Sequence, residues 1–130
     1  MRLAKIALAW AGTLLVGFGL AYVVAPVPLF ATAELRDLPP TALTDLRVMY
    51  GALQIVPGAF FLAAIFVRRW LEPAVVVCAA TFGALAALRS FGIAVDGTAN
   101  QYHGLALVFE IPTFALALFA RARLAASASA

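Results

Sequence analysis

Long apolar runs separated by short polar breaks make up most of this chain. The runs fall near residues 4–25, 45–67, 73–95 and 103–120. Each can cross the hydrocarbon core of a bilayer as a helix, which takes about 20 residues. The segment RRWLEP is expected to join the second run to the third, and DGTANQ the third to the fourth, because such residues favour turns. The pattern predicts one membrane domain, an all-α four-helix transmembrane bundle.

Composition supports this prediction. The 130 residues are 65% hydrophobic and 12% charged, whereas about half of a soluble domain is apolar. The net charge is +3, but the basic residues are scattered between apolar runs and form no stripe of the kind that binds nucleic acid. Cys78 has no partner for an internal disulfide and is expected to be a small buried apolar residue. We therefore expect the lipid bilayer, and no nucleic acid, as a partner.

The positions of Lys and Arg predict the topology. A four-pass chain places six of the nine basic residues on one side, namely Arg2, Lys5, Arg68, Arg69, Arg121 and Arg123. Cytoplasmic flanks of membrane helices are enriched in Lys and Arg. We therefore expect both termini in the cytoplasm, with residues 121–130 as a short cytoplasmic tail whose Ala/Ser-rich end is disordered.

The first run also has features of a cleavable signal peptide. Arg2 and Lys5 precede it, and Ala31-Thr32-Ala33 resembles a small-residue cleavage site. Its apolar core is longer than the usual range of about 7 to 15 residues, which favours a retained helix. The mass of the purified protein distinguishes the two alternatives, because cleavage would leave three helices.

Ionisable residues lie inside three of the predicted helices at a similar depth. Arg47, Arg89 and Glu110 each lie roughly 5 to 11 Å below the outer end of their helix, at 1.5 Å per residue. Such a residue at the centre of a membrane helix costs about 2.5–3.5 kcal/mol, so it normally faces a partner or a water-filled cavity. We therefore predict a polar site in the outer half of the membrane, built from Arg47, Tyr50, Gln54, Arg89, Asp96 and Glu110.

Helical spacing predicts which residues of the second helix lie on the same face. Residues three, four and seven apart share a helix face, so Arg47, Gly51, Gln54 and Gly58 form one stripe, with Tyr50 beside it. We expect this stripe to face the polar interior.

The charges predict specific pairs. Glu110 is expected to pair with Arg47 or Arg89, and Asp96 or Asp45 can serve the other arginine. Surplus positive charge would favour an anionic or carbonyl-bearing guest. His103 is expected in an interfacial loop, because one His and one lone Cys provide no metal-ligand spacing. We therefore predict no metal at this site.

The same residues resemble a known family. The segments DLRVMYGALQIVPG and FGALAALRSFGIAVDG, followed by a Glu in the last helix, are similar to the small bacterial membrane family called domain of unknown function 4345. The matching positions are Arg47, Tyr50, Gly51, Gln54 and Gly58, then Gly83, Arg89, Gly92, Asp96 and Gly97, then Glu110. The family usually has a second Gly where this chain has Ala52. The resemblance covers nearly the whole chain, implies a four-helix fold in a bacterial cytoplasmic membrane and supplies no activity.

Three functional hypotheses follow. The first is a binding module or small enzyme acting on a lipophilic molecule with one polar head. The absence of a Ser-His-Asp, Cys-His, metal or phosphate-loop signature argues against catalysis and against a cofactor. The second is a structural or assembly subunit, in a homo-oligomer or a larger membrane complex, whose polar cluster only fixes helix packing. The third is a proton or ion pathway, which is disfavoured because the inner half offers few polar groups.

Overall fold

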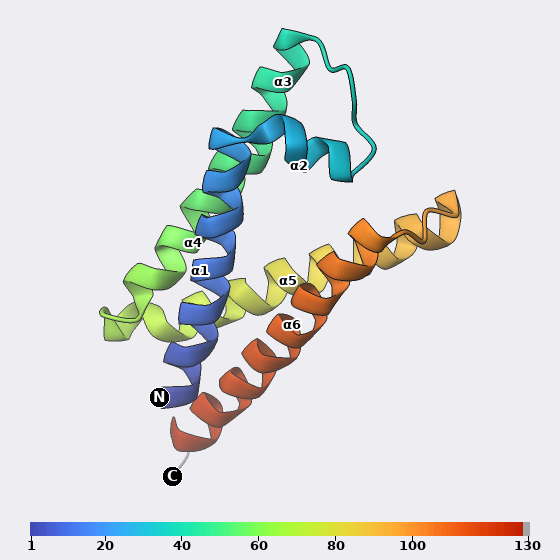
Figure 1. Ribbon diagram of the computed structural model, residues 1–130. Coiled ribbons are helices and arrows are strands. Elements are labelled where there is room, and N and C mark those ends of the chain that lie inside the picture. The colour runs from blue at the N-terminus through green and yellow to red at the C-terminus, as the bar shows by residue number, and fades with distance from the viewer. Residues whose placement is uncertain (129–130) are drawn as a thin grey trace.

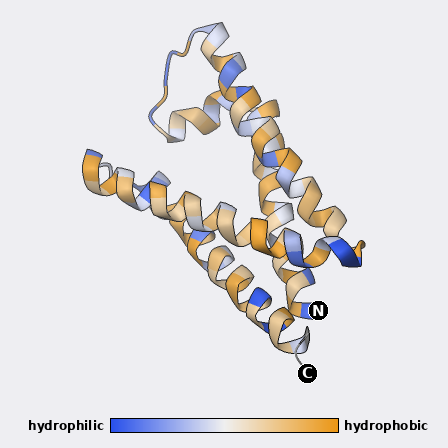
Figure 2. Cartoon of the chain, turned by 180° about the vertical axis from the view of Figure 1, so that it is seen from behind, coloured by the Kyte–Doolittle hydropathy of each residue, from blue (hydrophilic) through white to orange (hydrophobic). Residues whose placement is uncertain are grey.

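The computed structural model describes residues 1–128, which are helical apart from short connections and contain no strand. Four helical segments are long and apolar enough to cross a membrane: Arg2–Val24, Pro40–Ala64, Arg68–Asp96 and Gln101–Ser127. Figure 2 shows that these segments are mostly hydrophobic along their length. The prediction of an all-α chain with four membrane-length helices is therefore confirmed.

The second membrane-length segment consists of three pieces, and a short extra helix precedes it. The elements are α1 (Arg2–Val24), α2 (Pro26–Thr32), α3 (Pro40–Arg47), the π-helical turn η1 (Val48–Ala52), α4 (Leu53–Ala64), α5 (Arg68–Asp96) and α6 (Gln101–Ala128). A π-helix forms hydrogen bonds from residue i to i+5, so η1 holds an extra residue within an otherwise α-helical segment. The side chains before and after η1 are consequently rotated relative to each other.

The membrane-length helices form two pairs that diverge (Figure 1). The first pair is α1 with α4, and the second is α5 with α6. The pairs meet near the two chain termini, which we call the terminal half. They separate toward α3 on one side and the α5–α6 connection on the other, which we call the open half.

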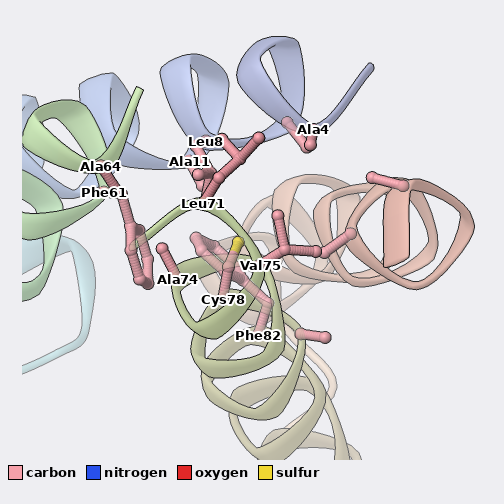
Figure 3. Packing of buried hydrophobic residues seen from close by; sticks show 14 of the residues in the cluster. Ala4, Leu8, Ala11, Phe61, Ala64, Leu71, Ala74, Val75, Cys78 and Phe82 are labelled. Carbon is pink, nitrogen blue, oxygen red and sulfur yellow. The ribbon is translucent and has the colours of Figure 1, made fainter. Parts of the chain in front are cut away.

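The hydrophobic core lies in the terminal half. It joins all four membrane-length helices, and Figure 3 shows labelled side chains from α1, α4 and α5 gathered there. Leu8, Phe61, Val75 and Cys78 are completely buried, as predicted for Cys78. Many other members are alanines: Ala4, Ala7, Ala11, Ala64, Ala74, Ala79, Ala117 and Ala120. Small side chains let membrane helices approach closely and gain van der Waals contacts.

Glycines bring α1 and α4 into direct contact. Gly12 and Gly19 on α1 face Gly58 and Gly51 on the partner segment. A Cβ at Gly58 would lie 2.9 Å from the backbone N of Val16, and a Cβ at Gly19 would lie 3.0 Å from the carbonyl O of Gly51. No larger residue fits such a contact without a shift of the backbone. The prediction that Gly51 and Gly58 face the polar interior is wrong, because both pack against α1.

The second membrane-length segment begins earlier than the predicted range of 45–67. It starts at Pro40 and ends at Ala64. Proline suits the first position of a helix, where its missing N–H would have no partner and its fixed φ is already helical. Pro40 therefore opens this helix, five residues before the predicted start at residue 45.

The third and fourth helices are longer than the predicted ranges of 73–95 and 103–120. The segment RRWLEP is not a turn, because α5 already begins at Arg68 and the true connection is residues 65–67. Pro73 lies inside the helix, as membrane helices tolerate. At the other end α6 continues to Ala128, so residues 121–128 of the predicted tail are helical, in line with the high helix propensity of alanine. Residues 129 and 130 lie outside the described part.

A compact connection joins α5 to α6. Gly97 has a φ of 65°, in the left-handed region that favours glycine, and its N–H donates to the carbonyl of Ile93 at 3.0 Å. The side chain of Asn100 then accepts a hydrogen bond from the backbone N of His103, also at 3.0 Å, and so caps α6. This cap places His103 in the first turn of α6, where the sequence had suggested a loop.

Candidate functional site

A cavity of about 500 Å³ lies between the two helix pairs. Residues of α1, η1, α4, α5 and α6 line it, and most of them are apolar, including Leu14, Phe18, Leu53, Phe82, Leu85, Leu105 and Phe109. The polar lining residues are Tyr22, Tyr50, Gln54, Thr81, Arg89, Tyr102 and Glu110. The cavity thus combines an extensive apolar wall with a small polar region.

An ion pair between α5 and α6 forms the centre of that polar region. Arg89 Nε lies 3.0 Å from Oε1 and 2.9 Å from Oε2 of Glu110, and Arg89 Nη2 lies 2.7 Å from Oε1. Both carboxylate oxygens therefore accept hydrogen bonds from one guanidinium, a strong and directional arrangement. Glu110 is only 6% exposed. The compact connection between the antiparallel helices places the two residues at the same level.

His103 and Tyr102 complete the surroundings of Arg89. Arg89 Nη1 lies 3.2 Å from His103 Nδ1. A guanidinium only donates hydrogen bonds, so Nδ1 must be the acceptor and the proton of the neutral ring lies on Nε2. The Arg89 guanidinium carbon also lies 5.9 Å from the centre of the Tyr102 ring. The seven-residue spacing of His103 and Glu110 on α6 could have indicated this neighbourhood, since such residues share a helix face.

Two further residues of the predicted site line the same cavity. Tyr50 packs against Tyr22 and Phe30, with ring centres 5.1 and 5.3 Å apart. Gln54 lies about one turn further along and is half-buried. The structure therefore brings Tyr50, Gln54, Arg89 and Glu110 to one cavity.

Arg47 and Asp96 lie elsewhere. Arg47 is exposed at the end of α3 and does not line the cavity. The extra residue in η1 rotates it away from the face that a uniform α-helix would give it. Asp96 is exposed at the end of α5, where it lines a separate depression together with Arg89 and His103. Within residues 1–128 the one ion pair is Arg89–Glu110, so the expected second pair is absent from this part of the chain.

Two contacts that cross between the helix pairs were not predicted. The indole N–H of Trp10 on α1 donates to the hydroxyl of Thr113 on α6 at 3.0 Å, and that hydroxyl donates to the carbonyl of Phe109 at 2.6 Å. The hydroxyls of Tyr22 and Tyr102 lie 3.5 Å apart. These residues are 80 or more positions apart in the chain, and nothing in the local sequence pattern indicates that they meet.

The ion pair engages both oxygens of Glu110 and leaves hydrogen-bond donors on Arg89. Glu110 is occupied by Arg89 at both oxygens, so it acts as a counter-ion that orients the guanidinium. Arg89 still carries a second N–H on each terminal nitrogen. No group of three or more His, Cys, Asp or Glu side chains among the described residues could hold a metal ion. The site offers hydrogen-bond donors beside an apolar wall.

Comparison with known proteins identifies a family. The family model described as "Domain of unknown function (DUF4345)" matches residues 3–121. The match includes the cavity-lining residues on all four membrane-length helices, and it confirms the resemblance that the sequence motifs indicate. Neither the curated proteins nor the solved structures contain a match to the chain.

Proposed function

The chain belongs to the DUF4345 family, and we propose that it is a small integral membrane protein that binds a lipophilic molecule carrying one polar head. The family description names no activity, so the proposal rests on the cavity between the helix pairs. The apolar body of the guest lies against the apolar wall, and its head contacts Arg89.

The observation that carries the proposal is the combination of cavity volume and lining. A volume of about 500 Å³ falls within the range of about 300–1,000 Å³ that is typical of small-molecule sites. Such sites are mostly apolar, with a few polar groups that orient the ligand. The lining of this cavity has the same division, with Arg89 and Glu110 among its few polar members.

The hydrogen-bonding groups favour a head that accepts hydrogen bonds. Arg89 has only donors, and Glu110 already orients it from one side. The amide of Gln54 and the hydroxyl of Tyr50 line the same space. A carbonyl-bearing head matches this donor-rich region.

We also propose that both termini face the cytoplasm of a bacterial cell and that the four helices cross its cytoplasmic membrane. The core joins Ala4, Ala64, Leu71 and Ala120, so the basic ends of α1, α5 and α6 lie near one another. Figure 2 shows a hydrophilic stretch at this end, where α5 begins with Arg68 and Arg69. Clustering of Lys and Arg on one side supports a cytoplasmic location.

A structural role is the alternative, and one observation favours it. The Arg89–Glu110 bond joins two helices that already pack together, and such a pair can serve only to fix helix register. In that case the chain would act as a subunit of a homo-oligomer or of a larger membrane complex, and the cavity would hold only lipid tails.

Retention of oleamide, which has one carbonyl head and a long apolar chain, tests the binding function. We expect native mass spectrometry to detect oleamide bound to the wild-type protein in detergent, and Arg89→Gln to reduce this retention about tenfold or more by removing the charged donors. Arg36→Gln is the matched control, because Arg36 is exposed in the loop after α2. Circular dichroism reports whether each variant is folded.

A second variant separates binding from folding. Arg89→Gln leaves Glu110 without its partner, so the double variant Arg89→Gln/Glu110→Gln removes both charges and keeps two amides that can bond to each other. The same loss of oleamide is expected from this folded double variant. Full retention by the double variant, or no retention by the wild-type protein, would contradict the binding function and favour the structural one.

A further inference from the structure

We propose that Glu110 makes the cavity selective for neutral polar heads over anionic ones. This inference rests on the proposed binding function and names the class of guest. Glu110 is thereby a specificity-determining residue, although the atom that contacts the guest belongs to Arg89.

The charged side chains around the cavity compensate each other, which favours a neutral head. Among the described lining residues, the charged side chains are Arg89 and Glu110, which compensate each other. Arg47 could have provided a surplus positive charge, but it is exposed on α3 and does not line the cavity. His103 contacts Arg89 through an acceptor nitrogen, so its ring adds no positive charge in this arrangement.

The position of the carboxylate disfavours an anion directly. Both Glu110 oxygens lie within 3.0 Å of Arg89 nitrogens, so a head that reaches the same guanidinium comes within a few ångströms of Glu110. Two like charges at such a separation repel strongly where water is scarce. An anionic head must also lose its hydration without a free counter-charge.

A neutral acceptor avoids these costs. A carbonyl oxygen can accept from the second N–H of a terminal nitrogen of Arg89 while the bonds to Glu110 stay intact. The buried carboxylate then strengthens binding indirectly, because it holds the guanidinium at the cavity wall. The same residue thus supports one class of head and repels the other.

Competition between two probes of equal chain length tests the selectivity. Oleamide and oleic acid differ only in the head, and the acid is ionised at about pH 9. The wild-type protein, in nanodiscs of neutral lipid with both probes at equal concentration, should retain oleamide in at least about tenfold excess over oleic acid by native mass spectrometry.

Glu110→Gln should shift this preference toward the acid by about tenfold or more, because glutamine keeps the size and one acceptor of glutamate but removes its charge. Glu72→Gln is the matched control, since Glu72 is exposed near the start of α5 in the terminal half. The control should show the wild-type ratio.

The outcomes separate this inference from the binding function. Equal retention of the two probes by the wild-type protein, or a preference for oleic acid, overturns the selectivity while leaving binding intact. Retention of neither probe overturns the binding function itself. If Glu110→Gln does not fold, the ratio of oleamide to oleic acid retained by the wild-type protein alone decides whether the cavity is selective. A folded Glu110→Gln variant with the wild-type ratio overturns the role of Glu110.

Discussion

The terminal half and the open half are built from the same four helices but from different side chains. In the terminal half, alanines and completely buried residues such as Leu8 and Phe61 fill the space between helices. In the open half, Phe18 and Leu53 are exposed, and a cavity separates the pairs. Apolar area alone drives little association in lipid, so membrane helices meet where small residues permit close packing. Residue size, more than hydrophobicity, therefore decides where these helices touch.

The two pairs are also joined internally in different ways. Glycines on α1 face glycines of η1 and α4, and this contact continues into the open half. In the second pair, Gly83 packs under the Phe114 ring, and the ion pair of Arg89 with Glu110 lies nearer the α5–α6 connection. Each pair is therefore held together by its own contacts, while a cavity remains between the pairs.

The largest expected difference between the halves comes from removing a large side chain. Phe61→Ala should lower the free energy of unfolding by about 3 kcal/mol, because Phe61 is completely buried and its loss leaves a void. Phe109→Ala should cost less than about 1 kcal/mol, since Phe109 already lines a cavity. Unfolding in mixed micelles of increasing sodium dodecyl sulfate content, followed by circular dichroism, measures both. Equal losses would show that the two halves are packed alike.

A smaller effect is expected at the contact of α1 with α4. Gly58→Ala should destabilise the protein by about 1–3 kcal/mol, because the new Cβ would meet the Val16 backbone N at 2.9 Å. Gly17→Ala is the control on α1, where a Cβ meets nothing within 4 Å. It should be neutral or stabilising by up to about 1 kcal/mol. The same unfolding assay applies, and a neutral Gly58→Ala would contradict the close approach.

The smallest effect concerns the hydrogen bond that joins the pairs at the edge of the cavity. Trp10→Phe removes the indole N–H that donates to Thr113, and interhelical bonds of this kind are worth about 0.6 kcal/mol on average. A double-mutant cycle with Thr113→Val isolates this contribution from the loss of ring contacts. Trp70→Phe with Thr113→Val is the control, because Trp70 packs against Phe60 instead. A coupling no larger than that of the control would mean that this bond does not hold the pairs together.

Much of the fold and part of the site could be predicted from the sequence. Run length and hydropathy predicted four membrane-length helices, and the energetic cost of intramembrane charge indicated that Arg89 and Glu110 would meet or face a cavity. The prediction that Arg47 lies in the polar site assumed one continuous α-helix. The π-helical turn η1 follows Arg47 and changes the helical phase, so this prediction was wrong. The prediction of a turn at RRWLEP was wrong because it took Pro73 as the first residue of the third helix, whereas α5 begins five residues earlier, at Arg68.

The amino-acid sequence alone predicted four membrane-length helices and which of them carry charge, because both depend on local composition and on the cost of placing polar groups in lipid. The packing of the helices, in contrast, sets the pairing of Glu110 with Arg89, the contact of Gly51 with α1, and the hydrogen bond of Trp10 with Thr113. Those outcomes depend on how far each helix is rotated and where the pairs diverge. Close packing between residues distant in the chain sets both quantities.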